Sequence, residues 1–211
     1  MKTLVAIPCM DSVPVWFTKS IDDLLPVGDT RKVYQPGSLV YASRNKLAQF
    51  AVSIGADYIC WFDSDMVFTA DTLQRLFKTL QETGADMVTG LYFRRVHPFT
   101  PVIFDKLEID KDGVCSWTEP EEIPAEPFEV GACGFGCVLM KTDVARAVMV
   151  EFGNMFCPIG NNGEDIAFCW RARQCGYKII CDPSIECGHI ATITVNRSFW
   201  ENYRRAKNGD N

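Results

Sequence analysis

The sequence predicts an α/β fold with a mostly parallel central sheet, and three observations support this prediction. Short apolar runs of strand length alternate along the chain with segments whose apolar residues recur at helical spacing. The 211 residues suit one domain rather than two. Apolar residues make up 47% of the chain and charged residues 23%, which is typical of folded proteins and argues against disorder and fibrous structure.

The first half of the chain alternates between strands and helices. Strands are predicted at 4–8, 57–62 and 87–93, and helices at 43–54 and 70–83. Pro8 ends the first strand, and an irregular loop is expected from there through Gly37. Ser43 is the expected N-cap of the first helix, while Gly55 and Gly84 end the two helices. This order predicts right-handed βαβ crossovers between parallel strands.

The second half begins with a departure from this alternation. Several prolines break the segment from 99 to 129 into short extended pieces, which predicts antiparallel hairpins or a surface excursion. A buried strand is expected at 135–140 and another at 178–181, and helices are expected at 142–152, with Thr142 as the cap, and at 164–175. Basic residues mark the end of the chain, where a loosely held helix is expected from Arg197. We therefore predict a domain over 1–195 and a basic tail over 196–211.

Composition and charge limit the function classes. The net charge of −6 argues against a protein that holds nucleic acid or an acidic membrane through a general positive field, although a local basic patch is compatible with it. No apolar run approaches the roughly 20 residues of a membrane-spanning helix, and the N-terminus lacks a secretory signal. We expect no membrane span and a cytoplasmic location, which would be the host cytoplasm if a phage encodes the protein. The oligomeric state is not predicted.

The ten cysteines do not form a recognisable metal or disulfide framework. No pair has the Cys-x-x-Cys spacing, and only two histidines accompany them, which disfavours a structural zinc site. Several lie within apolar runs, where cysteine packs as a small hydrophobic residue. We expect all of them to be reduced.

Asp63-Ser64-Asp65 is the first candidate functional motif. It follows a strand that is apolar throughout, and ligands of parallel sheets bind at the carboxyl ends of strands. Two carboxylates there suit a hard divalent cation that completes its shell with water and phosphate oxygens. The alternative is a pair of aspartates that merely cap the loop before the next helix. The second such triplet, at 110–112, stands beside Gly113 in a polar stretch and indicates a solvated turn.

Gly163-Glu164-Asp165 opens a predicted helix and supplies a second acidic pair. Acidic residues in a first helical turn are favoured by the macrodipole, so a purely structural role is one interpretation. The other is catalytic, because a carboxylate fixed in that position suits a group that receives a proton from an attacking hydroxyl.

Three further segments have weaker signals. His189 follows Gly188 near the end of the last predicted strand and is either a metal ligand or a hydrogen-bonded structural residue. Ser43-Arg44-Asn45 opens a helix, where backbone donors and an arginine can hold an anion, although a solvated cap explains it nearly as well. The glycines of 131–136 lead into a strand, not into a helix, so they are not a dinucleotide fingerprint and indicate a tight bend.

The order of these parts resembles that of the GT-A-fold glycosyltransferases. The matching parts are the strand Ala6-Ile7-Pro8, Ser43-Arg44-Asn45, Asp63-Ser64-Asp65, Gly131 to Gly136 before Cys137-Val138-Leu139-Met140, Gly163-Glu164-Asp165, and Gly188-His189. The resemblance covers about 3–190 and is closest to short, single-domain, family-two-like enzymes of bacteria and their phages. It implies a GT-A-type, single Rossmann-like domain with a mostly parallel central sheet and a small antiparallel excursion.

The resemblance also implies an activity and roles for residues. It implies transfer of a sugar from a nucleotide-diphosphate sugar, with UDP-sugar favoured, and Mn²⁺ or Mg²⁺ on the diphosphate. The implied metal ligands are Asp63, Asp65 and His189. The implied donor-binding residues are Pro8, Ser43, Arg44, Asn45, Asp63 and Ser64. The residues implied to lie on the acceptor side or the sugar side are Gly134, Phe135 and Gly136, and the implied catalytic base is Asp165 or Glu164. We expect an inverting transfer. Many such enzymes carry a membrane or acceptor-recognition module after the domain, and this chain stops, so the acceptor is not predicted.

Three other classes compete with this interpretation. Asp63-Ser64-Asp65-Met66-Val67 also fits the nucleophile loop of haloacid-dehalogenase-like phosphohydrolases, but that loop normally follows the first strand. A sugar nucleotidyltransferase would need a glycine-rich loop after the first strand, and 8–14 contains no glycine. A non-catalytic nucleotide-sugar binding module is the third alternative.

Overall fold

The computed structural model describes residues 1–110 and 114–208. Its strands are β1 (Lys2–Cys9), β2 (Asp29–Pro36), β3 (Tyr58–Phe62), β4 (Met66–Val67), β5 (Met87–Leu91), β6 (Ile103–Phe104), β7 (Lys106–Ile109), β8 (Cys115–Thr118), β9 (Phe128–Glu129), β10 (Ala132–Cys133), β11 (Cys137–Lys141), β12 (Ile179–Glu186) and β13 (Gly188–His189). Its helices are α1 (Val15–Asp23), α2 (Val40–Ser53), α3 (Thr72–Thr83), α4 (Thr142–Phe152), α5 (Glu164–Gln174) and α6 (Arg197–Asn208).

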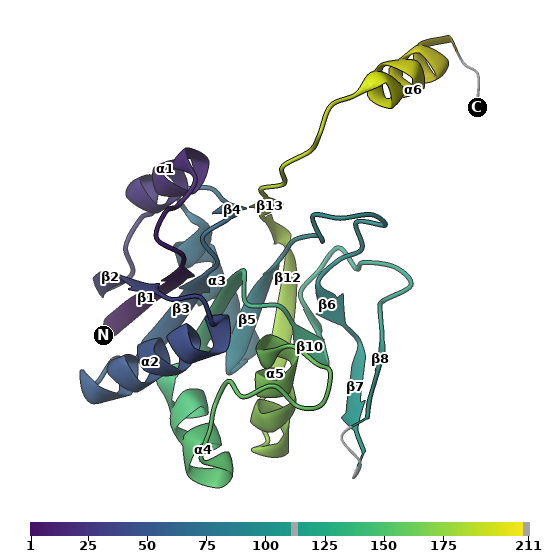
Figure 1. The fold of residues 1–211 in the computed structure, drawn as a ribbon. Helices are drawn as coiled ribbons and strands as arrows, with labels where there is room; N and C mark the ends of the chain where they lie inside the picture. Colours follow the sequence, from purple (N-terminus) through teal and green to yellow (C-terminus); the bar gives the residue numbers. More distant parts are fainter. Residues whose placement is uncertain (111–113, 209–211) are drawn as a thin grey trace.

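A seven-stranded sheet in the order β2-β1-β3-β11-β5-β12-β9 forms the centre of the molecule (Figure 1). β1 pairs in parallel with β2 and β3, and β12 pairs in parallel with β5, while β11 runs antiparallel between β3 and β5. The predicted α/β fold with a mostly parallel sheet is confirmed. The predicted antiparallel excursion contains the β7–β8 hairpin and the β6–β10 pair.

Helices cover both faces of the sheet and divide the core in two. On one face, apolar residues of α2, α4 and α5 pack against the sheet, and on the other face those of α1 and α3 do so. Alternate residues of one strand serve the two cores: Leu4 of β1 faces the first and Val5 the second. Both side chains are fully buried, which explains why the central strands are apolar throughout instead of alternating.

Two elements occupy the segment predicted to be a loop up to Gly37, so that prediction is wrong. α1 places Phe17 and Ile21 in the core, but its short length and lack of a side-chain cap give little sequence signal. β2 is an edge strand of mostly polar residues with intermediate or exposed side chains, so it has no apolar run. An edge strand is stabilised by ladder hydrogen bonds on one side, which sequence hydrophobicity does not report.

Two predicted helix caps are also wrong. α2 begins at Val40 after Leu39, and Ser43 is a buried residue within the helix. α4 begins after Lys141, and Thr142 is its first residue, with a buried hydroxyl that has no hydrogen-bond partner among the described residues. α4 follows β11 directly, so the end of that strand fixes where the helix begins. Gly84, by contrast, ends α3 in the left-handed conformation, as predicted.

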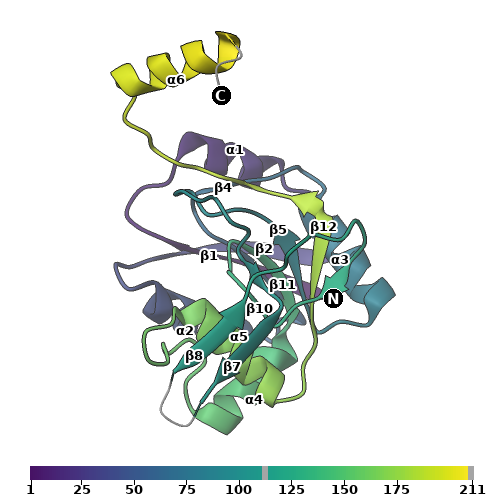
Figure 2. The ribbon, with the colours of Figure 1, turned by 90° about the vertical axis from the view of Figure 1, so that its right-hand side faces the viewer.

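The sequence also led to predictions about the cysteines, the turn at 110–112 and the C-terminal tail. The ten cysteines are all free. The predicted turn at 110–112 lies mostly outside the described residues. The tail does form a helix, α6, with no buried residue, and both Figure 1 and Figure 2 show it projecting away from the body. None of the helices in the described ranges has the length and apolarity that crossing a lipid bilayer requires.

Candidate active site

A cavity of 350 Å³ lies where β1 and β3 end, between α2, α5 and β13. Most residues predicted from the sequence to form the site line it: Pro8, Arg44, Asp63, Ser64, Asp65, Glu164, Asp165 and His189. The carboxyl ends of parallel strands thus collect the polar side chains, as the sheet topology requires. A larger hollow of 720 Å³ between α4 and α5 contains none of these residues. Because the acidic and basic groups cluster in the smaller of these two cavities, we assign the candidate active site to it.

The other predicted site residues lie behind the cavity wall. Ser43 is buried beneath Gly37, whose added Cβ would lie 2.6 Å from the Ser43 hydroxyl. Asn45 accepts a hydrogen bond from the backbone of Phe156 at 3.1 Å and so fastens the loop before α5. Phe135 is fully buried among aromatic rings of the core. The structure therefore gives these three residues supporting positions.

Tyr92 explains two of the three glycines of the 131–136 segment, Gly134 and Gly136. A Cβ on Gly134 would lie 2.0 Å from the Tyr92 hydroxyl, and one on Gly136 would lie 2.9 Å from its ring. The backbone N–H of Gly136 donates a hydrogen bond to the hydroxyl at 3.1 Å. The segment is the predicted tight bend, and its glycines let the chain pass close to an almost fully buried tyrosine.

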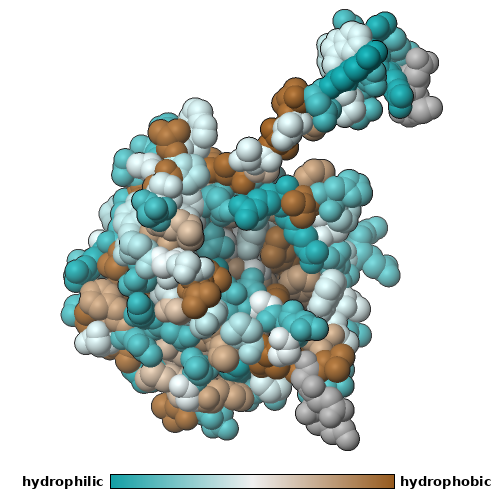
Figure 3. Space-filling view, viewed as in Figure 1, coloured by the Kyte–Doolittle hydropathy of each residue, from teal (hydrophilic) through white to brown (hydrophobic). Residues whose placement is uncertain are grey.

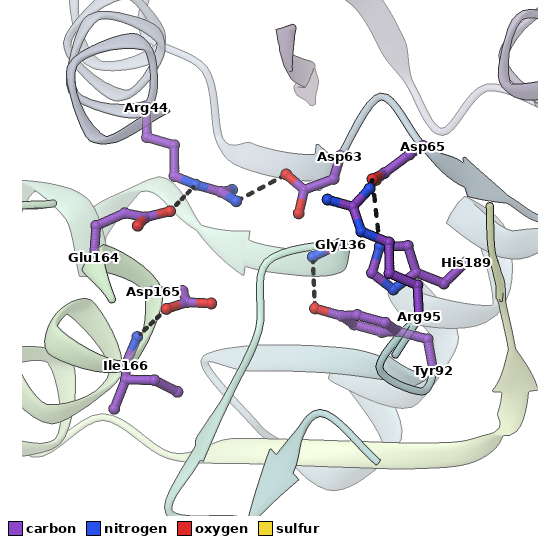
Figure 4. A network of polar contacts seen from close by, with 10 residues as sticks. All are labelled: Arg44, Asp63, Asp65, Tyr92, Arg95, Gly136, Glu164, Asp165, Ile166 and His189. Atoms are coloured by element: carbon purple, nitrogen blue, oxygen red, sulfur yellow. Dashed lines mark hydrogen bonds and ion pairs between the residues drawn. The ribbon is translucent and has the colours of Figure 1, made fainter. Parts of the chain in front are cut away.

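Arg44 connects two acidic groups of the cavity, as Figure 4 shows. Its Nη2 donates to Oδ1 of Asp63 at 2.8 Å and its Nε to Oε1 of Glu164 at 3.0 Å. The guanidinium is only 2% exposed and lies 5.3 Å from the ring centroid of Phe135 and 5.9 Å from that of Trp61. Burial opposes the charge of Arg44, but the neighbouring carboxylates raise its pKa nevertheless. Arg44 is therefore a fixed cation in the cavity wall.

Asp63 and Asp65 have opposite environments although one residue separates them. Burial raises the pKa of Asp63, against the opposing effect of Arg44. Burial also acts to raise the pKa of Asp65, but the hydrogen bond and charge of His189 and the charge of Arg95 bring it below its ordinary value. Asp65 is therefore ionised at neutral pH and faces two groups that attract a carboxylate.

The pairing of β4 with β13 brings His189 to Asp65. Met66 lies opposite His189 in this antiparallel pair, and the N–H of Ile190 donates to the carbonyl of Asp65 at 2.8 Å. The Nε2 atom of His189 lies 3.4 Å from Oδ2 of Asp65. Its Nδ1 lies 2.9 Å from the carbonyl oxygen of Phe93, which can only accept a hydrogen bond, so Nδ1 carries a proton and Nε2 faces the carboxylate.

Arg95 is a site residue that the sequence reasoning missed. Its Nη1 lies 2.5 Å from Oδ2 of Asp65, and its side chain is 54% exposed at the cavity mouth. Arg95 follows β5, which ends at the same edge of the sheet as β3. Ligands bind at the carboxyl ends of parallel strands, so the residues after β5 are candidates for the site just as those after β3 are. Arg94, beside it, pairs instead with Glu119 at 3.4 Å.

Glu164 and Asp165 are adjacent but are held differently. Arg44 binds Glu164, whereas Oδ1 of Asp165 accepts the N–H of Ile166 at 2.8 Å. Burial, together with the charge of Glu164, raises the pKa of Asp165 to about 6, although Arg44 opposes this. Asp165 is thus the carboxylate of the pair that can accept a proton near neutral pH.

Comparison with solved structures identifies the class of the fold. The crystal structure of A197 from STIV is 21% identical, with a TM-score of 0.63, and the match covers 90% of this chain and 86% of that one. The crystal structure of GalNAc-T7 with UDP, GalNAc and Mn²⁺ is 10% identical, with a TM-score of 0.59 over 90% of this chain. This chain covers only 44% of that second structure. The fold is that of the GT-A glycosyltransferases.

The sequence places the chain more specifically. The profile described as Glycosyl transferase family 2 matches residues 29–148, which include Asp63-Ser64-Asp65. No curated protein sequence matches the chain. The chain belongs to glycosyl transferase family 2, and it is a glycosyltransferase. The phosphohydrolase, nucleotidyltransferase and non-catalytic alternatives are therefore not supported.

Proposed function

We propose that this glycosyltransferase moves a sugar from a nucleotide-diphosphate sugar, with UDP-sugar the first choice, to an acceptor hydroxyl in a metal-dependent, inverting reaction. The observation that carries the proposal is the single cavity in which the Asp65–His189 pair and Asp165 are separated by the Arg44–Asp63 ion pair (Figure 4). One side then suits a diphosphate and the other an attacking hydroxyl. The acceptor itself is not proposed.

The residues of the first side fit a divalent metal ion. Asp65 Oδ2 and His189 Nε2 lie 3.4 Å apart and together offer a carboxylate and an imidazole. A metal-binding histidine usually donates its other ring N–H to a carbonyl or carboxylate, and the Nδ1 contact with Phe93 has this form. Among the described residues no three His, Cys, Asp or Glu side chains are arranged as a metal site, so diphosphate oxygens and water would have to complete the shell of the metal. Imidazole favours Mn²⁺ over Mg²⁺.

Asp63 is better suited to the donor than to the metal. Its Oδ1 binds Arg44, which keeps the carboxylate turned away from the Asp65–His189 pair. The same contact leaves Oδ2 available for a ribose hydroxyl, since an ionised carboxylate accepts several hydrogen bonds. Pro8 and Ser64 line the same part of the cavity and would contact the nucleoside.

The leaving diphosphate needs positive charge, and Arg95 supplies part of it. A divalent ion on Asp65 and His189 would stabilise the developing charge on the leaving group. Arg95, which is half-exposed and has its guanidinium at Asp65, would then turn from the carboxylate to the phosphate oxygens. Its planar donor group suits phosphate oxygens in bidentate geometry.

Asp165 is the better candidate for the base. An inverting displacement requires one group that takes the proton of the acceptor hydroxyl as it attacks opposite the leaving group. Glu164 is held by Arg44, while Asp165 makes only a backbone hydrogen bond to Ile166 among the contacts described above. A pKa of about 6 also lies near the operating pH, where a general base is most effective.

Calorimetric titration with UDP in EDTA and then in Mn²⁺ tests metal-dependent donor binding. We expect Mn²⁺ to strengthen UDP binding and Asp65→Asn to abolish this gain. The matched control is Asp71→Asn, which changes an aspartate outside the cavity, at the N-terminus of α3. Equal affinity with and without metal, or an unchanged metal effect in Asp65→Asn, would contradict the proposal.

The stereochemical part needs a separate measurement. Proton NMR of the newly formed glycoside should show the anomeric configuration opposite to that of the donor. A retained configuration would remove the need for a protein base and would contradict the role of Asp165, whatever the activity of its variants.

A further inference from the structure

One carboxylate oxygen of Asp65 faces two nitrogen atoms of the cavity (Figure 4). Its Oδ2 lies 2.5 Å from Nη1 of Arg95 and 3.4 Å from Nε2 of His189. Asp65 and His189 are the proposed metal ligands, and Oδ2 is the oxygen that a metal ion would share with the imidazole. Arg95 therefore holds the oxygen that the metal ion needs.

Arg95 is free to move in a way that Arg44 is not. The side chain of Arg95 is 54% exposed, whereas that of Arg44 is 2% exposed and binds two carboxylates. Asp65 is the single carboxylate that Arg95 contacts among the described residues. Helix α6 follows β13 in the chain, but it has no buried residue and stands clear of the body (Figure 3). Arg95 can thus leave Asp65 easily, because an exposed ion pair contributes little stability.

We propose that Arg95 is an internal counter-ion, which keeps a divalent metal ion away from Asp65 until a nucleotide diphosphate binds the guanidinium. Without the nucleotide, Arg95 stays at Oδ2 of Asp65, where its charge repels a second cation. With the nucleotide, phosphate oxygens accept the planar guanidinium in bidentate geometry, and the carboxylate becomes available. The inference rests on the proposed metal-dependent donor binding and concerns how that binding is controlled.

The exchange of Arg95 between two anionic partners couples the binding of metal and nucleotide. The nucleotide strengthens metal binding because it draws Arg95 from Asp65, and by linkage the metal strengthens nucleotide binding by the same factor. Direct contact between the metal and the diphosphate would add to this coupling. The share that depends on Arg95 is the share that disappears when the arginine is replaced.

Titration of the full chain with Mn²⁺ measures this share, with electron paramagnetic resonance reporting the free ion. Without nucleotide, Arg95→Gln should bind Mn²⁺ about tenfold more tightly than the wild-type protein, because the competing charge is gone. In saturating UDP, after correction for Mn²⁺ held by UDP in solution, the two affinities should agree within about twofold, because Arg95 has left Asp65 in the wild-type protein as well.

Two further variants separate charge from other effects. Arg95→Lys keeps the positive charge beside Asp65, so its Mn²⁺ affinity without nucleotide should stay near that of the wild-type protein. Arg94→Gln is the matched control, since Arg94 pairs with Glu119 at 3.4 Å and does not line the cavity. It should bind Mn²⁺ as the wild-type protein does, with and without UDP. Thermal melting verifies that each variant is folded.

Three results would overturn the inference, and they differ in what they mean for the proposed function. Equal Mn²⁺ affinity of the wild-type protein and Arg95→Gln without nucleotide would refute the role of Arg95 and leave metal-dependent donor binding intact. The same difference with and without UDP would show that Arg95 remains at Asp65 in the nucleotide complex. Lack of Mn²⁺ binding in both proteins, even in UDP, would contradict the proposed metal site together with this inference.

Discussion

Arg44 shows how one buried side chain organises the acidic groups of the cavity. It binds Asp63 and Glu164, which lie on different elements of the fold, and it is 2% exposed. Removal of one partner from a buried ion-pair network leaves the others uncompensated. The arginine therefore stabilises the site as well as shaping it.

We predict that Arg44→Met lowers the free energy of unfolding by about 3 kcal/mol, because Asp63 and Glu164 would lose the charge that compensates their burial. Denaturant unfolding at neutral pH measures the change. Arg44→Lys is the control: it keeps the charge but loses the planar fork, so its loss should be smaller. Wild-type stability in Arg44→Met would show that solvent already screens both carboxylates.

For Asp165, we predict that Asp165→Asn lowers kcat by about 10²- to 10⁴-fold while UDP binding stays nearly unchanged. In the wild-type enzyme, kcat/KM should rise with pH through about 6, since the base must be unprotonated. Initial rates across pH measure this dependence. Glu164→Gln is the comparison variant. If kcat fell only in Glu164→Gln and not in Asp165→Asn, Glu164 would be the base.

The same group should affect stability in a defined direction. The pKa of Asp165 is raised from 3.8 to about 6 in the fold, so its contribution is complete below pH 4 and is lost as the pH rises through 6. Asp165→Asn should therefore be more stable than wild type at pH 7.5, by up to about 3 kcal/mol. Unfolding curves at pH 4 and pH 7.5 measure this difference, and a stabilisation of equal size at both would contradict the ionisation argument.

At the scale of elements, the bend before β11 depends on one close contact. The chain passes Tyr92 so closely that a Cβ on Gly134 would lie 2.0 Å from its hydroxyl. The bend positions β11 between β3 and β5, and the carbonyl of Gly136 accepts the N–H of Asp63 at 3.3 Å. A glycine here therefore affects the cavity through the sheet.

We predict that Gly134→Ala destabilises the protein by about 1–3 kcal/mol, because the added methyl group overpacks the bend. The cost should be smaller in a Tyr92→Phe background, which removes the nearest atom, although Val102 at 2.7 Å still limits the space. Unfolding of both single variants and the double variant measures the coupling. Strictly additive changes would show that the backbone shifts to avoid Tyr92.

In the whole molecule, α6 takes no part in either hydrophobic core. The cores draw their residues from the strands, from α1 to α5 and from the loops between them, and α6 has no buried residue. A helix that buries nothing adds little to the free energy of unfolding.

We therefore predict that truncation after Asn196 changes the free energy of unfolding by less than about 0.5 kcal/mol. Chemical denaturation of the full and truncated chains measures it. A larger loss would mean that α6 packs on the body in solution.

The α/β class, most of the central strands and helices, and the acidic groups of the cavity could all be predicted from the sequence. These features are predictable because they depend on local sequence: the spacing of apolar residues indicates a buried strand or an amphipathic helix. The ends of parallel strands also meet at one edge of the sheet, which places the acidic groups together. α1 and β2 were not predicted, because a short uncapped helix and a polar edge strand show almost no regular spacing of apolar residues.

Which of these groups contact one another follows from long-range packing and could not be predicted from the sequence. Arg44 and Glu164 are 120 residues apart in the chain, and His189 reaches Asp65 only because β13 pairs with β4. The antiparallel direction of β11 and the contact of Tyr92 with the glycine bend are likewise long-range choices. Such pairings depend on how sheet and helices pack together, and hydrophobic periodicity within a single segment carries no information about its partner.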